Sequence, residues 1–320
     1  PEYGKLSGNS LEQLSHGAGG RVTERSGKKH PADFFLWKPD SSHIMRWPSP
    51  WGEGYPGWHI ECSAMATSIL GPQLDIHTGG EDNIFPHHEC EIAQSQGATG
   101  QRFSQFWMHT RHLMVDGTKM SKSKGNFFTI RDLVAKGYDP LAIRYALINT
   151  RYRESMNFSL TGLQEAALAV GTLRDLAEKL TLAAGNAKAA DLLASDQKML
   201  DEFTKAMDED LNSAGALAAV FSWASPLNKQ KKVPAEAAVS ALAALKKIDH
   251  VLAVIFPPLR ALPPETVGKI EELMTQRAAA RANKDWASSD ALRTELLALG
   301  VEVKDGPGGS VWRPRLAPAS

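Results

Sequence analysis

One short run of lysine, methionine and serine residues has the types and spacing for phosphate chemistry. Residues 119–123 read Lys-Met-Ser-Lys-Ser, and Lys124, Gly125 and Asn126 follow. Ammonium groups beside hydroxyls suit a loop that closes on a polyphosphate, where lysine acts as a point charge on the phosphates. The glycine and asparagine permit the sharp turn that ends such a loop. The alternative is a solvated surface loop that binds nothing.

A second set of residues combines a thiol, an imidazole and a carboxylate. His87 and Glu91 lie four positions apart, so in a helix their side chains share one face. Cys62 lies upstream, at the end of the segment Gly-Trp-His-Ile-Glu-Cys. These three ligand types fit zinc, although dispersed residues of this kind also occur at surfaces without a metal. Cys90 adjoins Glu91 and competes with it as a ligand, but we expect Cys90 to be a buried spectator thiol.

The composition limits the classes of protein that remain. The chain has 320 residues, with 36 Lys+Arg and 36 Asp+Glu, so its formal net charge is zero. A neutral balance neither indicates nor excludes an RNA partner, since a local basic face is sufficient. Two cysteines cannot staple a protein of this size, which favours a reducing, cytoplasmic setting. No apolar run approaches the roughly 20 residues of a membrane helix, so we expect no membrane partner.

The first half of the chain has the pattern of an α/β sheet. Residues 1–56 read as irregular. The predicted elements after them are a helix over 62–70, a strand over 74–77, a helix from Pro86 and a strand over 107–115. This alternation indicates parallel crossovers. Ligands of such sheets bind beyond the carboxyl ends of the strands, where His77 and residues 119–123, called the lysine loop below, are both expected to lie.

The second half has the composition of a helix bundle. Thr129 and Asp139-Pro140 are N-cap signals for two shorter helices. The predicted long helices cover 161–184, 196–223 and 235–256. The predicted C-terminal elements are a helical pair after Pro263-Pro264 and a β-hairpin that joins 301–303 to 310–312.

Several segments resemble a known family. Residues 119–123 resemble the KMSKS signature of class I aminoacyl-tRNA synthetases. The segments 57–65, 75–80 and 85–89 are similar to motifs of cysteinyl-tRNA synthetases, in that family's order and spacing. The Asp-Ala-Leu-Arg string at 290–293 is similar to the hallmark of the DALR anticodon-binding domain. The resemblance implies an α/β fold: part of a Rossmann-like class I synthetase catalytic domain, an α-helical bundle and a small mixed α/β anticodon-binding region.

The resemblance also implies domain boundaries. The implied parts are the end of an inserted connective region (1–56), the second half of the Rossmann-like catalytic domain with the zinc site and the lysine loop (57–126), a stem-contact region (127–160), a helical bundle of DALR type (161–262) and a small C-terminal anticodon-binding subdomain (263–320). The family's other signature, HIGH, does not occur in this sequence. We therefore expect an N-terminally truncated fragment that is inactive alone.

The activity that the resemblance implies is an ATP-dependent ligation of L-cysteine to tRNA(Cys). Cysteine and ATP, with Mg²⁺, form cysteinyl adenylate, and the aminoacyl group then moves to the terminal ribose of the tRNA. Lys119 and Lys122 are the implied catalytic residues, with Lys122 on the ATP phosphates. His77, Gly79 and Gly80 are the implied further ATP contacts. A Gly-Gly pair is also a common turn, and a histidine beside it also caps a strand.

One zinc ion per chain is the implied metal. Its ligands here are Cys62, His87 and Glu91, and the family's fourth ligand is a cysteine from a segment that this sequence lacks. Zinc lowers the pKa of the substrate thiol and binds the thiolate, a bond that serine cannot match, so no editing domain is needed. Trp58 lines the cysteine pocket in the family, and the alternative is an ordinary core tryptophan.

The C-terminal region supplies the implied RNA contacts. The candidates for reading anticodon bases by hydrogen bonding and stacking are Arg281, Trp286, Asp290 and Asp305. Two other functions stay open: a ligase that joins cysteine to a glucosamine–inositol acceptor and has no anticodon-binding region, and a non-catalytic RNA-binding module. The residues after Pro263 favour the synthetase over the first, and the intact metal and lysine motifs favour it over the second. We expect a monomer.

Overall fold

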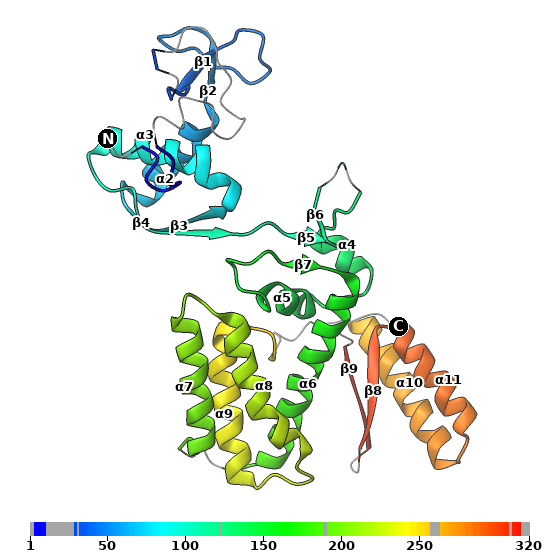
Figure 1. Cartoon of the computed structure of the whole chain (residues 1–320). Helices are drawn as coiled ribbons and strands as arrows, with labels where there is room; N and C mark the ends of the chain where they lie inside the picture. Colours follow the sequence, from blue (N-terminus) through cyan, green and yellow to red (C-terminus); the bar gives the residue numbers. More distant parts are fainter. Residues whose placement is uncertain are drawn as a thin grey trace. The chain divides into compact units, whose positions relative to one another are not determined.

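A computed structural model of the chain forms two compact units (Figure 1). The residues that it describes are 3–10, 29–30, 32–121, 123, 125–187, 191–256, 263–306 and 309–314. The first unit covers Pro1–His112 and the second covers Leu113–Ser320. None of the described helices is both long enough and apolar enough to cross a membrane.

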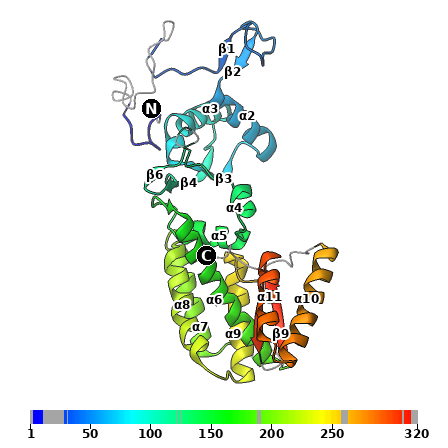
Figure 2. The same cartoon turned by 90° about the vertical axis from the view of Figure 1, so that its right-hand side faces the viewer.

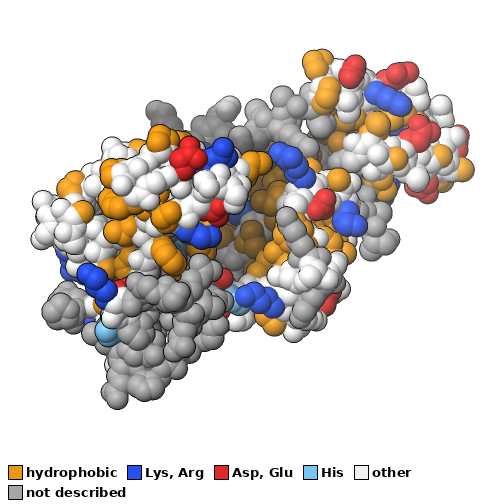
Figure 3. Space-filling model, turned by 90° about the horizontal axis from the view of Figure 1, so that it is seen from above, with side chains coloured by type: hydrophobic (Ala, Val, Ile, Leu, Met, Phe, Trp, Pro, Cys, Tyr) orange, Lys and Arg blue, Asp and Glu red, His pale blue; other side chains and the backbone are white. Residues whose placement is uncertain are grey.

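The first unit begins with a small antiparallel sheet. β1 (Trp37–Pro39) pairs with β2 (Gly54–Pro56), and the Nζ of Lys38 donates a hydrogen bond to the Tyr55 hydroxyl at 2.6 Å. The prediction of irregular chain misses this sheet, because strands of three residues with proline carry no alternating pattern. The segment between the strands exposes large apolar side chains; Trp51 is 70% exposed. Figure 3 shows how widely hydrophobic side chains reach the surface in one view of the molecule.

The remainder of the first unit is a helix followed by a β-α-β crossover. α2 (Trp58–Leu70) ends at Gly71, whose φ of 96° favours glycine. The crossover consists of β3 (Leu74–Gly80), η1 (Glu81–Asn83), η2 (Ile84–His88), α3 (Glu89–Thr99) and β4 (Ser104–Thr110). β4 pairs with β3 in parallel, so the predicted parallel crossover is confirmed.

Several predicted boundaries differ from the structure; the strand predicted over 74–77, for example, extends to Gly80. The helix predicted over 62–70 begins one turn earlier, at Trp58, because Gly57 is extended and forms the N-cap. The strand predicted over 107–115 is two strands, because β4 ends at Thr110 and β5 (Met114–Val115) lies in the second unit. The polar residues Arg111 and His112 lie at this break, and the prediction included them in a single strand.

A three-stranded sheet opens the second unit. β5 turns into β6 (Thr118–Lys119) through Asp116 and Gly117, which both have positive φ, as a two-residue hairpin of this kind requires. β7 (Asn157–Phe158) pairs in parallel with β5. Lys119, the first lysine of the lysine loop (residues 119–123), is the last residue of β6 in this sheet.

Two capped helices follow the lysine loop. The Thr129 hydroxyl accepts a hydrogen bond from the backbone N–H of Asp132 and caps α4 (Ile130–Ala135). The Asp139 carboxylate accepts from the backbone N–H of Leu141 and caps α5 (Pro140–Ile148). Both predicted N-caps are confirmed.

The next part of the second unit is a helix bundle (Figure 2). Its described helices are α6 (Leu160–Ala184), α7 (Ala194–Asp208), α8 (Ser213–Lys229) and α9 (Ala235–Leu252). The single helix predicted over 196–223 is α7 and α8, because Asp210 and Leu211 adopt positive φ and Asn212 caps α8. The buried face of α6 contributes Leu163, Val170, Leu173, Leu176 and Leu180 to the core.

The last elements form a smaller core. α10 (Pro264–Ala282) packs against α11 (Trp286–Ala298), and β8 (Val301–Gly306) pairs with β9 (Gly309–Pro314) in an antiparallel hairpin. The buried side chains of this core are Ile270, Leu273, Leu296, Val301 and Val303. The predicted helical pair and closing hairpin are confirmed, with longer strands than predicted.

Candidate metal centre and active site

The three residues predicted to bind a metal meet in the first unit. Cys62 comes from α2, His87 from η2 and Glu91 from α3, and one ligand atom of each lies within 4.8 Å of the others. His87 and Glu91 are buried, and Cys62 is half-buried. The buried hydroxyl of Ser63 donates a hydrogen bond to the Gln94 Oε1 at 2.7 Å and so ties α2 to α3.

Glu91 is the charged centre of this group. Its Oε1 lies 3.3 Å from the Nε2 of His87, and its Oε2 lies 2.9 Å from the Nε2 of His77. Burial works against ionisation of Glu91, yet the imidazoles of His77 and His87 lower its pKa. Among the described residues, none completes a well-formed hydrogen bond to Oε2. A buried carboxylate oxygen in that state, beside a thiol and an imidazole, fits a divalent metal with soft and nitrogen ligands.

His59 is a neighbour of the metal group that sequence reasoning missed. Its Nδ1 lies 2.7 Å from the Nδ1 of His87, which leaves the His87 Nε2 facing Glu91. Burial, and then repulsion from His87, lowers the pKa of His59. A hydrogen bond of this kind fixes which nitrogen of a histidine is available to a metal. The only signal in the sequence is that His59 lies almost one helical turn before Cys62.

Trp58 lies at the entrance of the same group. Its ring centroid is 4.5 Å from that of His87, and the residue is 64% exposed. The alternative of an ordinary core tryptophan therefore does not hold for this side chain. An exposed indole beside a metal group is suited to contact a small bound substrate.

A second histidine cluster shares Glu91. His77, His88 and Glu91 also place one ligand atom each within 4.8 Å of the others, and the Nδ1 of His88 lies 2.8 Å from the Nε2 of His109. His88 is buried, and burial lowers its pKa to about 4. The His88 imidazole on this side of Glu91 is therefore neutral at neutral pH. The cluster contains no thiol, so a soft metal favours the group that contains Cys62.

Close contacts inside the protein explain why residues 79 and 80 are glycines. A Cβ at Gly79 would lie 2.7 Å from the Cε1 of His88, and a Cβ at Gly80 would lie 2.6 Å from the Oδ1 of Asp82. The histidine cluster thus needs a residue without a side chain at Gly79. Sequence reasoning explained both glycines by the close approach of a nucleotide and missed this internal packing.

Cys90 stands apart from the metal group. Its thiol is buried, and burial raises its pKa to about 11. Its Sγ lies 3.4 Å from the hydroxyl of Tyr3, and the adjacent Glu89 accepts hydrogen bonds from the backbone N–H groups of Gly4 and Ser7. These contacts hold residues 3–8 against α3. A neutral thiol in this position agrees with the expected spectator role.

One asparagine, Asn126, is hydrogen-bonded to the first part of the lysine loop. The backbone N–H of Ser121 donates to the Oδ1 of Asn126 at 2.9 Å, and the Nδ2 of Asn126 donates to the Lys119 carbonyl at 3.3 Å. Met120 packs against the main core, whereas the Lys119 residue is exposed. Lys122 and Lys124 lie outside the described residues, so the role of Lys122 stays a prediction.

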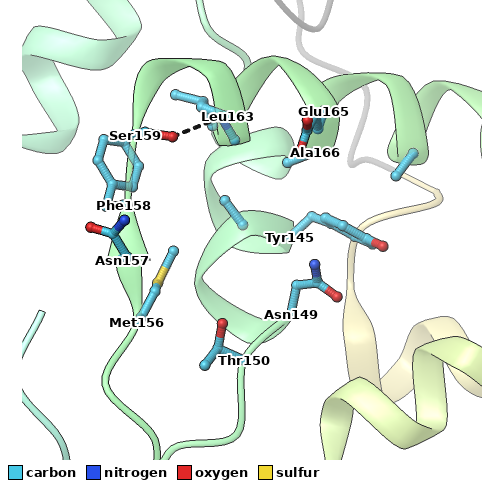
Figure 4. Close-up of a pocket in the computed structure, with 13 residues that line it drawn as sticks. Tyr145, Asn149, Thr150, Met156, Asn157, Phe158, Ser159, Leu163, Glu165 and Ala166 are labelled. Atoms are coloured by element: carbon cyan, nitrogen blue, oxygen red, sulfur yellow. Dashed lines mark hydrogen bonds between the residues drawn. The ribbon is translucent and has the colours of Figure 1, made fainter. Parts of the chain in front are cut away.

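A cavity of about 290 Å³ lies between α5, β7 and α6 (Figure 4). Its lining combines apolar and polar side chains, among them Tyr145, Asn149, Met156, Phe158, Leu163 and Glu165. Asn157 at its edge accepts a hydrogen bond from the backbone N–H of Gly117 at 2.7 Å, which ties β7 to the β5–β6 turn. Of the residues predicted to be functional, those that the structure describes do not line this cavity.

Three of the four predicted anticodon contacts lie together in the C-terminal core. The Nη1 of Arg281 donates to the Oδ2 of Asp305 at 3.1 Å, and the Arg281 guanidinium lies 5.8 Å from the centre of the Trp286 ring. Asp290 is exposed on α11 and adds a small contribution to the raised pKa of Arg277, which comes chiefly from the hydrogen bond to Asp305. Arg277 is buried and bonded to Asp305, and sequence reasoning missed it.

Comparison with protein families assigns three parts of the chain. The model described as the catalytic domain of class I (C) tRNA synthetases matches residues 1–168. The DALR domain matches residues 202–256, and the cysteinyl-tRNA ligase anticodon binding domain matches residues 263–313. The last match disfavours the glucosamine–inositol ligase, which has no such region.

Curated relatives agree with these matches. The chain is 44% identical over 322 residues to the cysteine–tRNA ligase of Symbiobacterium thermophilum, covering 98% of this chain and 68% of that protein. It is 45% identical over 316 residues to the ligase of Delftia acidovorans, covering 98% and 66%. The ligase of Haemophilus influenzae is 44% identical over 317 residues, covering 98% and 67%. The chain therefore spans about two thirds of the length of these relatives and belongs to the cysteine–tRNA ligase family of class I aminoacyl-tRNA synthetases.

Proposed function

We propose that the full-length protein activates L-cysteine with ATP to give cysteinyl adenylate and transfers the cysteinyl group to tRNA(Cys). The observation that supports this most directly is the convergence of Cys62, His87 and Glu91 beside the exposed Trp58. A non-catalytic RNA-binding module has no use for a metal group of this kind, so we prefer the ligase.

Zinc is the metal that this donor set suits, with Cys62, His87 and Glu91 as its ligands from this chain. When bound, zinc supplies a soft Lewis acid that coordinates the substrate thiol as a thiolate. Serine has a far less acidic hydroxyl and cannot make an equivalent bond, so the site rejects serine without editing. Trp58 covers one side of the bound amino acid and helps to exclude water.

We assign the lysine loop, residues 119–123, to binding the phosphates of ATP. Lys119 and Lys122 supply positive charge to the phosphates, Lys122 in the transition state, while Asn126 holds the first part of the loop. ATP enters with Mg²⁺ as a substrate. Gly79 and Gly80, at the carboxyl end of β3, lie where a nucleotide binds in parallel sheets. His77, which lies beside Glu91, is the further residue that we assign to ATP binding.

The tRNA partner is recognised in part by the C-terminal core. Arg281 and Trp286 form an exposed cation–π pair on which an unpaired base can stack, and Asp305 holds Arg281 in place. Asp290 is the fourth residue that we assign to this surface. We also propose a cytoplasmic monomer, which size-exclusion chromatography of the full-length protein with and without tRNA would check.

Pyrophosphate exchange by the full-length protein tests the activity. We expect exchange that depends on cysteine and is negligible with serine. The Lys122→Ala variant should lower the exchange rate by about 100-fold or more, because a charge contact to the phosphates is lost. Equal exchange with serine would contradict the metal-based selection, and normal exchange by Lys122→Ala would remove Lys122 from the mechanism.

A further inference from the structure

Arg277 is an unusual residue because its whole side chain is buried. It is the largest of the described side chains that are fully buried, and 2% of its surface is exposed. Its Nε lacks a hydrogen-bond partner within the part of the chain that the structure describes. Burying a charge is costly, and a well-packed apolar side chain of similar volume often serves stability as well or better. Stability alone therefore does not explain an arginine here.

The guanidinium of Arg277 fixes the carboxylate of Asp305. Its Nη1 donates to Oδ1 at 2.8 Å and its Nη2 donates to Oδ2 at 2.9 Å, a two-pronged contact that sets both the position and the plane of the carboxylate. The hydroxyl of Ser310, across the hairpin, donates to the same Oδ1 at 2.5 Å. Asp305 is thus held from α10 and from β9.

The fixed carboxylate in turn holds an exposed arginine. Arg281 lies one helical turn after Arg277 on α10, and its Nη1 reaches the Oδ2 of Asp305 at 3.1 Å. The Arg281 side chain is 38% exposed and Trp286 is 57% exposed, so part of this pair faces solvent. A long side chain that is already ordered loses less entropy when it binds a partner.

We propose that Arg277 is a positioning residue for RNA recognition. It is buried and does not touch the RNA, but it orients Asp305 and thereby holds the Arg281 guanidinium beside the Trp286 ring. The ligand of this surface is an unpaired base, which stacks on the pair and accepts hydrogen bonds from Arg281. The inference deepens the proposed function and depends on it.

The test uses the full-length protein and two substitutions. Arg277→Met keeps an unbranched side chain that can stay buried but removes the contact with Asp305. We expect the KM for tRNA(Cys) in aminoacylation to rise about tenfold, the size of effect that coupled neighbours show. Cysteine-dependent pyrophosphate exchange, which needs no tRNA, should be unchanged. Discrimination against a tRNA with a substituted anticodon base should fall.

A double-substitution cycle separates positioning from a general structural role. If Arg277 acts through Asp305 and Arg281, then Arg277→Met adds no further rise in KM once Arg281→Ala is present. Effects that multiply would overturn the proposal. Leu296→Ala is the matched control, because Leu296 is fully buried in the same core and does not contact these charges. Leu296→Ala should lower the melting temperature without changing anticodon discrimination.

Two further outcomes keep the test decisive. If Arg277→Met does not fold, Arg277→Lys retains the charge without the two-pronged contact, and the same rise in KM and the same absence of an added effect are expected. An unchanged KM in a folded Arg277 variant, with a raised KM in Arg281→Ala, would overturn the positioning role alone. An unchanged KM in Arg281→Ala and Trp286→Ala would instead overturn the proposed RNA surface.

Discussion

The metal group and the Arg277–Asp305 cluster each hold a carboxylate, which is buried in Glu91 and partly exposed in Asp305, and they balance its charge differently. Glu91 is buried among imidazoles, of which His88 titrates far below neutral pH. Asp305 faces the permanent positive charges of Arg277 and Arg281. In our proposal the first group binds an added cation, whereas residues of the chain balance the charge of the second. We therefore expect the metal group to need a bound cation for its final order and the Arg277–Asp305 cluster to need none.

The largest expected effect is on metal binding. Glu91→Gln keeps the size of the side chain but removes the negative charge of the carboxylate. We expect zinc affinity of the full-length protein to fall by more than about 100-fold, since even the loss of an outer partner costs up to that much. Competition with a chelating indicator measures the affinity. Asp305→Asn is the matched control and should leave it unchanged; an equal loss in both variants would break the comparison.

Asp305 should contribute stability with a defined pH dependence. The hydrogen bonds from Arg277, and next from Ser310, lower the pKa of Asp305 below its ordinary value despite some desolvation. A depressed pKa stabilises the fold above the unfolded-state value of about 3.9, and this stabilisation is lost as the pH falls through the folded-state value.

Asp305→Asn should therefore reduce the free energy of unfolding by about 2 kcal/mol at neutral pH, because it weakens a contact to a buried charge. The difference from the wild type should shrink as the pH drops below about 4. Urea unfolding at several pH values measures it. A difference that grows on acidification would show that the sign of this interaction is wrong.

His59 should tune the metal group more mildly than Glu91. His59→Ala removes the hydrogen bond to the Nδ1 of His87 but leaves every proposed ligand in place. We expect a loss of about tenfold in zinc affinity, with partial recovery in His59→Gln. Zinc competition at constant pH gives the values. Unchanged affinity in His59→Ala would mean that His87 needs no orienting partner.

The smallest effect is expected at the joint between the hairpin and the bundle. Lys304 and Arg313 both contact the Asp175 carboxylate of α6, and Asp175 is 43% exposed. Exposed pairs contribute little, so Lys304→Ala should change the free energy of unfolding by less than about 1 kcal/mol. Added salt should reduce even this change. If Lys304→Ala lowered the free energy of unfolding as much as Asp305→Asn does, the contact of Lys304 with Asp175 would not behave as an exposed ion pair.

The closeness of two of the proposed metal ligands could be predicted from the sequence for a physical reason. His87 and Glu91 are four residues apart, and helical spacing alone brings them to one face. Cys62 needed the family resemblance, because only the packing of α2 on α3 brings it close. His59 and His88 could not be predicted, since a single histidine in a helix carries no sign of the partner that it meets.

The fold shows the same limit. The caps at Thr129 and Asp139 and the crossover from β3 to β4 follow from local patterns, and both could be predicted. The break between α7 and α8 could not, because Asp210 and Leu211 adopt a positive φ that their side chains do not favour. Arg277 reads as an ordinary exposed residue until the hairpin brings Asp305 over it.

The zinc content of the full-length protein tests the central claim most directly, because the two cysteines of this chain provide an internal control. Metal analysis after exhaustive dialysis should find one zinc per chain in the wild type and in Cys90→Ser, and a large loss in Cys62→Ser. Zinc retained by Cys62→Ser, or lost from Cys90→Ser, would contradict the assignment of Cys62, His87 and Glu91 as the metal group.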